Sequence, residues 1–382
     1  MDATTRRTAP APAPAPWRRE PARATGRALA VFAAVRGGGA LVIALGAWWA
    51  GRDPVKVLGG SWDSFWYLSI AAHGYGRTQM WPASDSIQSD AAFFPLFPVL
   101  THLFGGGPVA ALAVAWTAAG AAAAGVYRIG ERLLGPRAGV LLVALWASLP
   151  HAVVLTLAYT EPLLCALAAW ALYALLRERW LWAAALAVLA GLTRPTGIAV
   201  AAAVSAVALR ELLRGGRAPA VWAAGLLAPA GWTAYVVAVG VRRHEPLGYF
   251  TVQRQWGSRF DFGAGTVAAV GRILTGGNVT VPVAVTVAGL AVAVLCAVLL
   301  PLDRAPLPLL VYTGVLLVIT VGGAGFFESK PRFLLPAFPL LLPAAAAMAR
   351  ARPRTAVAVT AGLAGLSYGY GAYLLLIAKV PL

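Results

Sequence analysis

The sequence predicts an all-α, polytopic membrane protein. Of its 382 residues, 60% are hydrophobic and only 12% are charged, about half the charged share of an ordinary soluble domain. Several apolar stretches approach or exceed the ~20 residues that a helix needs to cross a bilayer. The alternating pattern of barrel strands is absent, and lipid cannot satisfy an unpaired backbone. We therefore expect these stretches to be transmembrane helices.

The chain divides into a tail and one membrane domain. Residues 1–27 are rich in Pro and Ala and carry six arginines, which predicts a disordered, basic cytoplasmic tail. A secretory signal is the alternative, but no short apolar region with a small-residue cleavage site follows early enough. Residues 28–382 form the predicted polytopic domain. Its first span, 28–50, is interrupted by Arg36 and Gly37–Gly39, so Arg36 should face other helices.

About eleven spans are expected, within a range of nine to twelve. The short apolar pieces at 138–150 and 180–209 are candidates for broken or re-entrant helices. With the tail inside, the larger outer loops are 51–92, 241–278 and 323–332. The remaining spans are expected near 108–127, 138–150, 161–176, 180–193, 196–209, 218–240, 279–301, 307–322, 333–349 and 355–377.

The net charge of +17 would suggest nucleic acid in a soluble protein. In a membrane protein it indicates basic loops beside anionic lipid, so no nucleic-acid partner is expected. The positive bias toward the inner side is nevertheless weak. An anionic ligand at the outer face would explain the surplus there, whereas a mis-threaded helix is the alternative. The outer bases are Arg52, Lys56, Arg77, Arg194, Arg242, Arg243, Arg254, Arg259, Arg272, Lys330, Arg332 and Lys379.

Asp63 is the carboxylate that stands out in the first outer loop. In a helix over 61–73, Asp63, Trp66, Tyr67 and Ile70 would share one face. Such a helix would lie in the membrane interface, with its aromatics at headgroup depth. A partly desolvated carboxylate there suits a general base. The alternative is that Asp63 simply caps the start of the helix.

Two further groups of polar residues are expected on the outer side. Glu161, next to Pro162 at the start of a span, either complements the helix dipole or contacts substrate. Lys330 and Arg332, in "FFESKPRFLLP", either bind phosphate oxygens or form an ordinary membrane-edge cluster. Arg194, in "LTRPTG", lies between two short apolar pieces and should face a cavity.

Other polar residues carry weaker expectations. Asp90 ends a connector expected to be flexible, "WPASDSIQSDAAFF", which also contains Asp85. Its closeness to "FFPLFP" keeps it as a second outer-loop candidate. His73 is either a second polar group of the site or an ordinary interfacial histidine, and the second interpretation is slightly favoured. Asp53 precedes Pro54 in a predicted turn.

No cofactor or metal site is firmly predicted. The sequence has none of the motifs GxGxxG followed by an acid, GxxxxGK[ST], HExxH or CxxC, and its four histidines are scattered. No set of carboxylates clearly converges on an ion, so dependence on a divalent metal stays open. Cys165 and Cys296 lie in apolar runs and are expected to be packing residues.

Several motifs together resemble a known family. "WDSFWYLSIAAHGYG", "FFPLFPVL", "YTEPLLCALAAWALY", "AGLTRPTGIAV" and "PRFLLPAFPLLLP" occur in family order between residues 60 and 345. They look like the bacterial branch of the PIG-V type mannosyltransferases. The Trp-Asp and Phe-Phe-Pro pair is the more specific part, because Ala/Leu-rich helices resemble one another easily.

The resemblance implies a GT-C membrane glycosyltransferase with a polyprenyl-phosphate sugar as co-substrate. It implies transfer of mannose, with inversion, at the extracytoplasmic face of the plasma (inner) membrane. Asp63 matches the position of the family's catalytic acid, and no soluble outer domain is evident, so the acceptor should be small or lipidic. The residues expected to bind substrate are Trp62, Tyr67, His73, Asp90, Glu161, Arg194, Lys330 and Arg332.

Two other functions compete with glycosyl transfer. A transporter or flippase of a lipid-linked sugar would also use outward bases and broken helices. It predicts inverted repeats, which the sequence does not show. A non-catalytic membrane scaffold predicts that Asp63 tolerates replacement.

Overall fold

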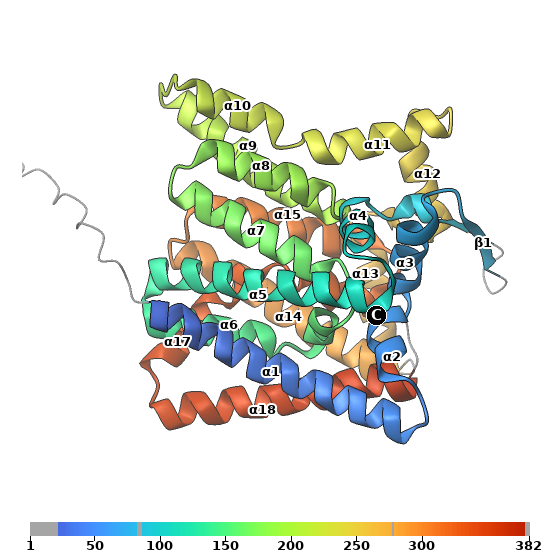
Figure 1. Cartoon of the computed structure of the whole chain (residues 1–382). Helices are drawn as coiled ribbons and strands as arrows, with labels where there is room; N and C mark the ends of the chain where they lie inside the picture. Colours follow the sequence, from blue (N-terminus) through green and yellow to red (C-terminus); the bar gives the residue numbers. More distant parts are fainter. Residues whose placement is uncertain (1–21, 82–85, 277–278, 379–382) are drawn as a thin grey trace, which may run out of the picture.

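The computed structural model describes residues 22–81, 86–276 and 279–378. Long helices lie side by side in it and the strands are short, which confirms the expected helical class (Figure 1). Of the predicted tail, residues 1–21 lie outside the described residues, as do Asp85 and Lys379. The first helix begins at Ala22, six residues earlier than expected, so residues 22–27 are helical.

The helices follow one another with short connections except at one end of the bundle. They are α1 (Ala22–Trp49), α2 (Pro54–Gly60), α3 (Asp63–His73), α4 (Leu96–Leu103), α5 (Gly107–Leu134), α6 (Pro136–Ala147), α7 (Glu161–Leu176), α8 (Trp180–Gly191), α9 (Ile198–Leu213), α10 (Pro219–Leu227), α11 (Ala230–Arg242), α12 (Gly248–Gln255), α13 (Ala264–Leu274), α14 (Val281–Leu302), α15 (Leu307–Gly322), α16 (Lys330–Leu334), α17 (Leu342–Arg350) and α18 (Pro353–Ala372).

Short 3₁₀ and π segments and four strands complete the described chain. The 3₁₀ segments are η1 (Asp90–Ala92), η2 (Pro150–Thr156), η3 (Pro195–Gly197), η4 (Phe327–Ser329) and η5 (Phe338–Leu341), and η6 (Tyr373–Ala378) is a π-helix. The strands are β1 (Thr78–Trp81), β2 (Ser86–Ser89), β3 (Arg259–Phe260) and β4 (Gly323–Ala324). They form two antiparallel pairs, β1 with β2 and β3 with β4.

The expected spans coincide with helices or with bent helix pairs. Six helices of the described chain are long and apolar enough to cross a membrane, and two bent pairs raise this to eight. The helices α7, α8 and α15 are apolar but shorter. A polytopic helical protein is therefore confirmed, while the count of about eleven spans stays a prediction.

Breaks in the helices occur where the sequence interrupts its apolar runs. α6 and η2 meet at 88°, with Pro150 at the start of η2, where a proline ends the helical hydrogen-bond ladder. Arg36 is fully buried beside this bend, so the expectation that it faces other helices is confirmed. Its Nη1 donates to the carbonyl oxygen of Ala147 at 3.0 Å and lies 3.3 Å from Ser367 Oγ. A cation at the carbonyl end of α6 also complements the helix dipole.

The first outer loop contains the predicted helix but places its aromatic face differently. Trp66, Tyr67 and Ile70 are each 6% exposed, because Trp66 and Tyr67 pack against protein rings, among them Phe93. These rings therefore face protein and not lipid, although Phe65 is exposed, and the depth of α3 in the membrane stays a prediction. The connector expected to be flexible forms the β1–β2 pair, apart from residues 82–85, which lie outside the described residues.

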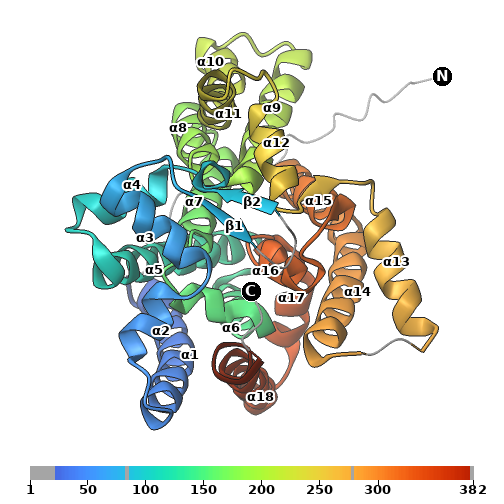
Figure 2. The same cartoon turned by 90° about the vertical axis from the view of Figure 1, so that its right-hand side faces the viewer.

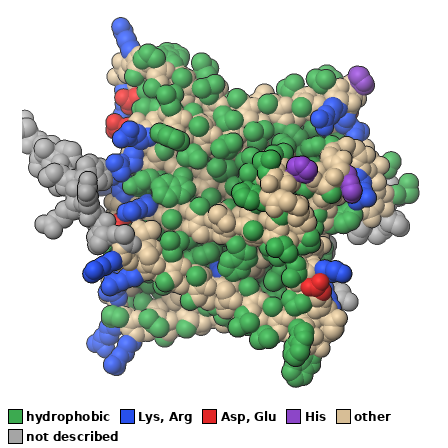
Figure 3. All heavy atoms as spheres, viewed as in Figure 1, with side chains coloured by type: hydrophobic (Ala, Val, Ile, Leu, Met, Phe, Trp, Pro, Cys, Tyr) green, Lys and Arg blue, Asp and Glu red, His purple; other side chains and the backbone are tan. Residues whose placement is uncertain are grey.

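The bundle has two polar ends separated by an apolar band. In Figure 3, Lys and Arg gather along the edge opposite the end that carries α3. We call the latter the α3 end; it also carries the turns at 148–160, 192–197 and 323–341 (Figures 1 and 2). This division is the one expected of a membrane protein whose polar residues lie in its connections.

Close packing of α8 against α11 generates a stability prediction. A Cβ at Gly231 would lie 2.0 Å from the carbonyl oxygen of Val188, whereas one at Gly120 in α5 would meet nothing within 4 Å. We expect Gly231→Ala to destabilise the protein by about 1–3 kcal/mol, because the backbone must move. Gly120→Ala should be neutral or stabilising, because alanine favours helix. Thermal unfolding in detergent compares them, and equal melting temperatures would contradict the packing.

Candidate active site

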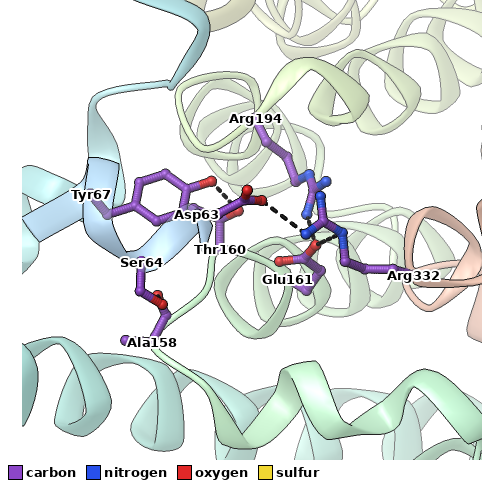
Figure 4. A network of polar contacts seen from close by, with 8 residues as sticks. All are labelled: Asp63, Ser64, Tyr67, Ala158, Thr160, Glu161, Arg194 and Arg332. Atoms are coloured by element: carbon purple, nitrogen blue, oxygen red, sulfur yellow. Dashed lines mark hydrogen bonds and ion pairs between the residues drawn. The ribbon is translucent and has the colours of Figure 1, made fainter. Parts of the chain in front are cut away.

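Four charged side chains meet at the α3 end (Figure 4). Arg332 Nη1 lies 2.9 Å from Asp63 Oδ2, and Arg332 Nε lies 3.2 Å from Glu161 Oε1. Arg194 Nη1 pairs with the same Glu161 oxygen. We call Asp63, Glu161, Arg194 and Arg332 the ion-pair network. All four were expected to be site residues from the sequence, and the structure brings them together.

The network is assembled from segments that are far apart in the chain. Asp63 and Glu161 are the first residues of α3 and α7, where the helix dipole favours a negative charge. Arg194 precedes Pro195 in the break between α8 and α9, where its backbone is extended and lies outside the helical hydrogen-bond ladder. Arg332 lies in the five-residue helix α16. The interruptions in the helices therefore place the charges.

Burial separates one member of the network from the others. The exposed fractions of the side chains are 1% for Glu161, 8% for Arg332, 10% for Arg194 and 27% for Asp63. Two carboxylates and two guanidinium groups balance formally, as buried charges require. Asp63 is thus the member of the network most accessible to a substrate.

Aromatic rings support the two arginines. The Arg332 guanidinium carbon lies 5.4 Å from the centre of the Tyr159 ring and 5.1 Å from that of Phe333. Arg194 lies 5.8 Å from the Phe333 ring. Such cation–π contacts stabilise guanidinium groups that have left water. Tyr159 and Phe333 were not predicted as site residues, and the available signal was only that each adjoins a charged motif in the chain.

Hydrogen bonds fasten α3 to the segment that precedes Glu161. Tyr67 Oη lies 3.1 Å from Thr160 Oγ1, and Ser64 Oγ donates to the carbonyl oxygen of Ala158 at 3.0 Å (Figure 4). Burial raises the pKa of the Tyr67 phenol well above its usual range, and the nearby Asp63 carboxylate raises it further. Tyr67 therefore stays neutral and orients its neighbours instead of acting as a base.

Other expected site residues have partners outside the network. Lys330 is buried, and its Nζ donates to the carbonyl oxygens of Thr320 and Gly323, at 2.5 and 2.6 Å. Asp90 accepts hydrogen bonds from the backbone N–H groups of Gly76 and Arg77, at 2.9 and 2.8 Å. Both residues fix connecting segments of the α3 end, and their substrate-binding roles stay predictions.

The start of α3 bears on the alternative role for Asp63. Trp62 occupies the N-cap position with φ 49° and makes no side-chain capping bond. The Asp63 carboxylate instead pairs with Arg332, so the capping interpretation is not supported. A capping aspartate occurs at Asp53, which accepts from the Val55 N–H at 2.8 Å. His73 is exposed at the far end of α3.

Metal ligation has no evident centre in the part of the chain that the structure describes. There, no three or more His, Cys, Asp or Glu residues cluster as they would around an ion. Dependence on a divalent metal therefore stays open, as in the sequence analysis.

Comparison with known proteins supports the fold. No model of a known protein family matches the sequence, and no curated protein matches it significantly. A solved structure with the same fold is that of ArnT from Cupriavidus metallidurans bound to undecaprenyl phosphate, at a TM-score of 0.50 and 17% identity. The match covers 87% of this chain but only 62% of ArnT. The chain therefore shares a polytopic helical fold with ArnT, whereas membership of the GT-C glycosyltransferases and the resemblance to PIG-V type mannosyltransferases stay predictions.

The shared carboxylate of Glu161 generates the next prediction. Glu161→Gln would leave the buried Arg194 without a carboxylate partner among the described residues, so we expect a loss of about 3 kcal/mol or more in stability. The double variant Glu161→Gln with Arg194→Gln should recover part of this loss. Glu178→Gln, which neutralises an exposed acid, is the matched control. Thermal unfolding in detergent would refute the assignment if Glu161→Gln and Glu178→Gln melted together.

Proposed function

We propose that the protein is an inverting membrane glycosyltransferase that uses a polyprenyl-phosphate sugar. The proposal includes mannose as the sugar and a lipid as the acceptor, at the extracytoplasmic face of the plasma membrane. One observation carries it: a partly exposed carboxylate, Asp63, pairs with the buried Arg332, which Glu161 links to the buried Arg194 at one end of the bundle. The fold shared with ArnT, which was solved with undecaprenyl phosphate bound, supports the choice of donor lipid.

Asp63 is the proposed general base. The acceptor hydroxyl oxygen attacks the anomeric carbon of the donor sugar, and its proton passes to the Asp63 carboxylate. The bond between that carbon and the phosphate oxygen breaks, and polyprenyl phosphate leaves with the electron pair. Because this leaving group is already a stable anion, a protonating acid is less necessary than in glycoside hydrolysis. A single carboxylate thus suffices for inversion.

Arg194 and Arg332 are the proposed partners of the donor phosphate. Guanidinium groups bind phosphate oxygens through paired N–H groups and offset charge that develops on the leaving group. Arg194 Nε is buried without a hydrogen-bond partner, so this arginine has a donor to spare. The aromatic rings beside both arginines exclude water, which strengthens these interactions.

Replacing the proposed base tests the function directly. We expect Asp63→Asn to lower sugar transfer by ~10²-fold or more, because asparagine cannot accept the hydroxyl proton. The assay incubates membranes with labelled polyprenyl-phosphate mannose and measures label in lipids and proteins. Asp53→Asn is the matched control, since asparagine also caps helices. Its transfer should stay normal.

Two outcomes would contradict the proposal. Near-normal transfer by Asp63→Asn, at equal membrane level, would remove Asp63 as the base. Movement of the donor lipid across vesicle membranes without any labelled product would favour the transporter instead.

A further inference from the structure

A second basic site lies at the α3 end, separate from the ion-pair network. It is a pocket of about 260 Å³ that shares no lining residue with the network. Trp256, adjacent to the pocket in sequence, packs its ring 5.3 Å from that of Trp66 in α3. The pocket is thus close to the helix that begins with Asp63. Its lining residues are Arg254, Gly257, Arg259, Ala324 and Gly325.

Backbone geometry shapes the floor of the pocket. The strands β3 and β4 pair there, with Arg259 opposite Ala324. Gly257 and Gly325 adopt φ values of 80° and 83°, which favour glycine. A Cβ on Gly325 would lie 2.3 Å from the carbonyl oxygen of Gly257. No side chain therefore fits where the backbone at Gly257 meets that at Gly325. Arg254 and Arg259 supply the polar groups that line the pocket.

The two arginines of the pocket are not held in ion pairs. Arg254 and Arg259 are exposed, and neither forms an ion pair with a carboxylate within the described ranges. The closest acid in sequence, Asp261, accepts from the N–H groups of Gly263 and Gly265 at 3.0 and 2.7 Å. Among the described residues Arg254 donates to Thr251 Oγ1 at 2.8 Å, and that hydroxyl donates to Glu245 Oε1 at 2.6 Å, so Glu245 is linked to Arg254 only through Thr251. Two positive charges thus face the pocket.

Exposed apolar side chains continue from the pocket along the same segment. Phe260 and Phe262 are 50% and 91% exposed, and Val267 and Leu274 of α13 are 73% and 81% exposed. Figure 2, which looks onto this end, shows α13 at the periphery of the bundle. An exposed apolar surface beside arginines is typical of a segment that meets lipid chains below charged headgroups.

We propose that Arg254 and Arg259 bind the phosphate of an anionic lipid acceptor, whose chains lie along Phe260, Phe262 and α13. The pocket is distinct from Arg194 and Arg332, which the proposed function assigns to the donor phosphate. A glycosyl transfer between two lipids that each carry a phosphate needs two such sites. The role of the bound lipid as acceptor rests on the proposed function, whereas its binding does not.

A lipid-binding measurement tests the site without any transfer reaction. The full-length protein is delipidated, exposed to vesicles of phosphatidylglycerol or phosphatidylcholine, and analysed by native mass spectrometry. We expect phosphatidylglycerol to be preferred, and the double variant Arg254→Gln with Arg259→Gln to lose about 30-fold in affinity for it. The control, Lys56→Gln with Arg243→Gln, removes two exposed charges that lie neither in the pocket nor on α13 and should keep the preference.

Three outcomes would overturn the inference. Retained phosphatidylglycerol preference in the Arg254/Arg259 variant would exclude the pocket. Competition by inorganic phosphate as tight as that by the lipid would exclude a lipid ligand. Loss of polyprenyl-phosphate binding in that variant, with phosphatidylglycerol binding intact, would assign the pocket to the donor. None of these depends on Asp63, so the result stands apart from the test of sugar transfer.

Discussion

The interaction on which the site depends is the double ion pair of Glu161. This carboxylate is 1% exposed and contacts both Arg194 and Arg332. A buried guanidinium group without a counter-charge costs several kcal/mol. The start of α7, the break before α9 and the short helix α16 must therefore stay together. The network thus holds three segments together at the same place where the proposed function puts the substrate.

Broken helices allow these charged side chains to meet inside the bundle. A continuous helix keeps its backbone satisfied and can present a charged side chain only sideways, into neighbouring helices. At the 88° bend between α6 and η2, and again around 327–341, the chain turns within the bundle. These turns bring helix ends to the centre of the α3 end. The buried Arg36 contributes by binding the carbonyl oxygen of Ala147, the last residue of α6.

The sequence predicted the helices and the charged members of the site, but not their contacts. Apolar runs give helix positions because lipid imposes a length and a hydropathy. Asp63, Glu161, Arg194 and Arg332 were identifiable because charge is scarce in such a chain. The burial of Trp66 and Tyr67 was not, because an aromatic helix face is compatible with both lipid and protein. The partners of Lys330 likewise depend on tertiary packing that no local pattern reports.

The unequal burial of the two carboxylates explains how one network can be both stable and reactive. Arg332 contacts Asp63 and Glu161 at once. If Asp63 turns toward an acceptor hydroxyl, Glu161 keeps the Arg332 guanidinium paired, so no buried cation is left without a counter-charge. The same exchange would not be tolerated at Glu161, since Arg194 has no other carboxylate partner among the described residues. The more exposed acid is therefore the one that the proposed reaction can use, and the buried acid is the one that holds the arginines in place.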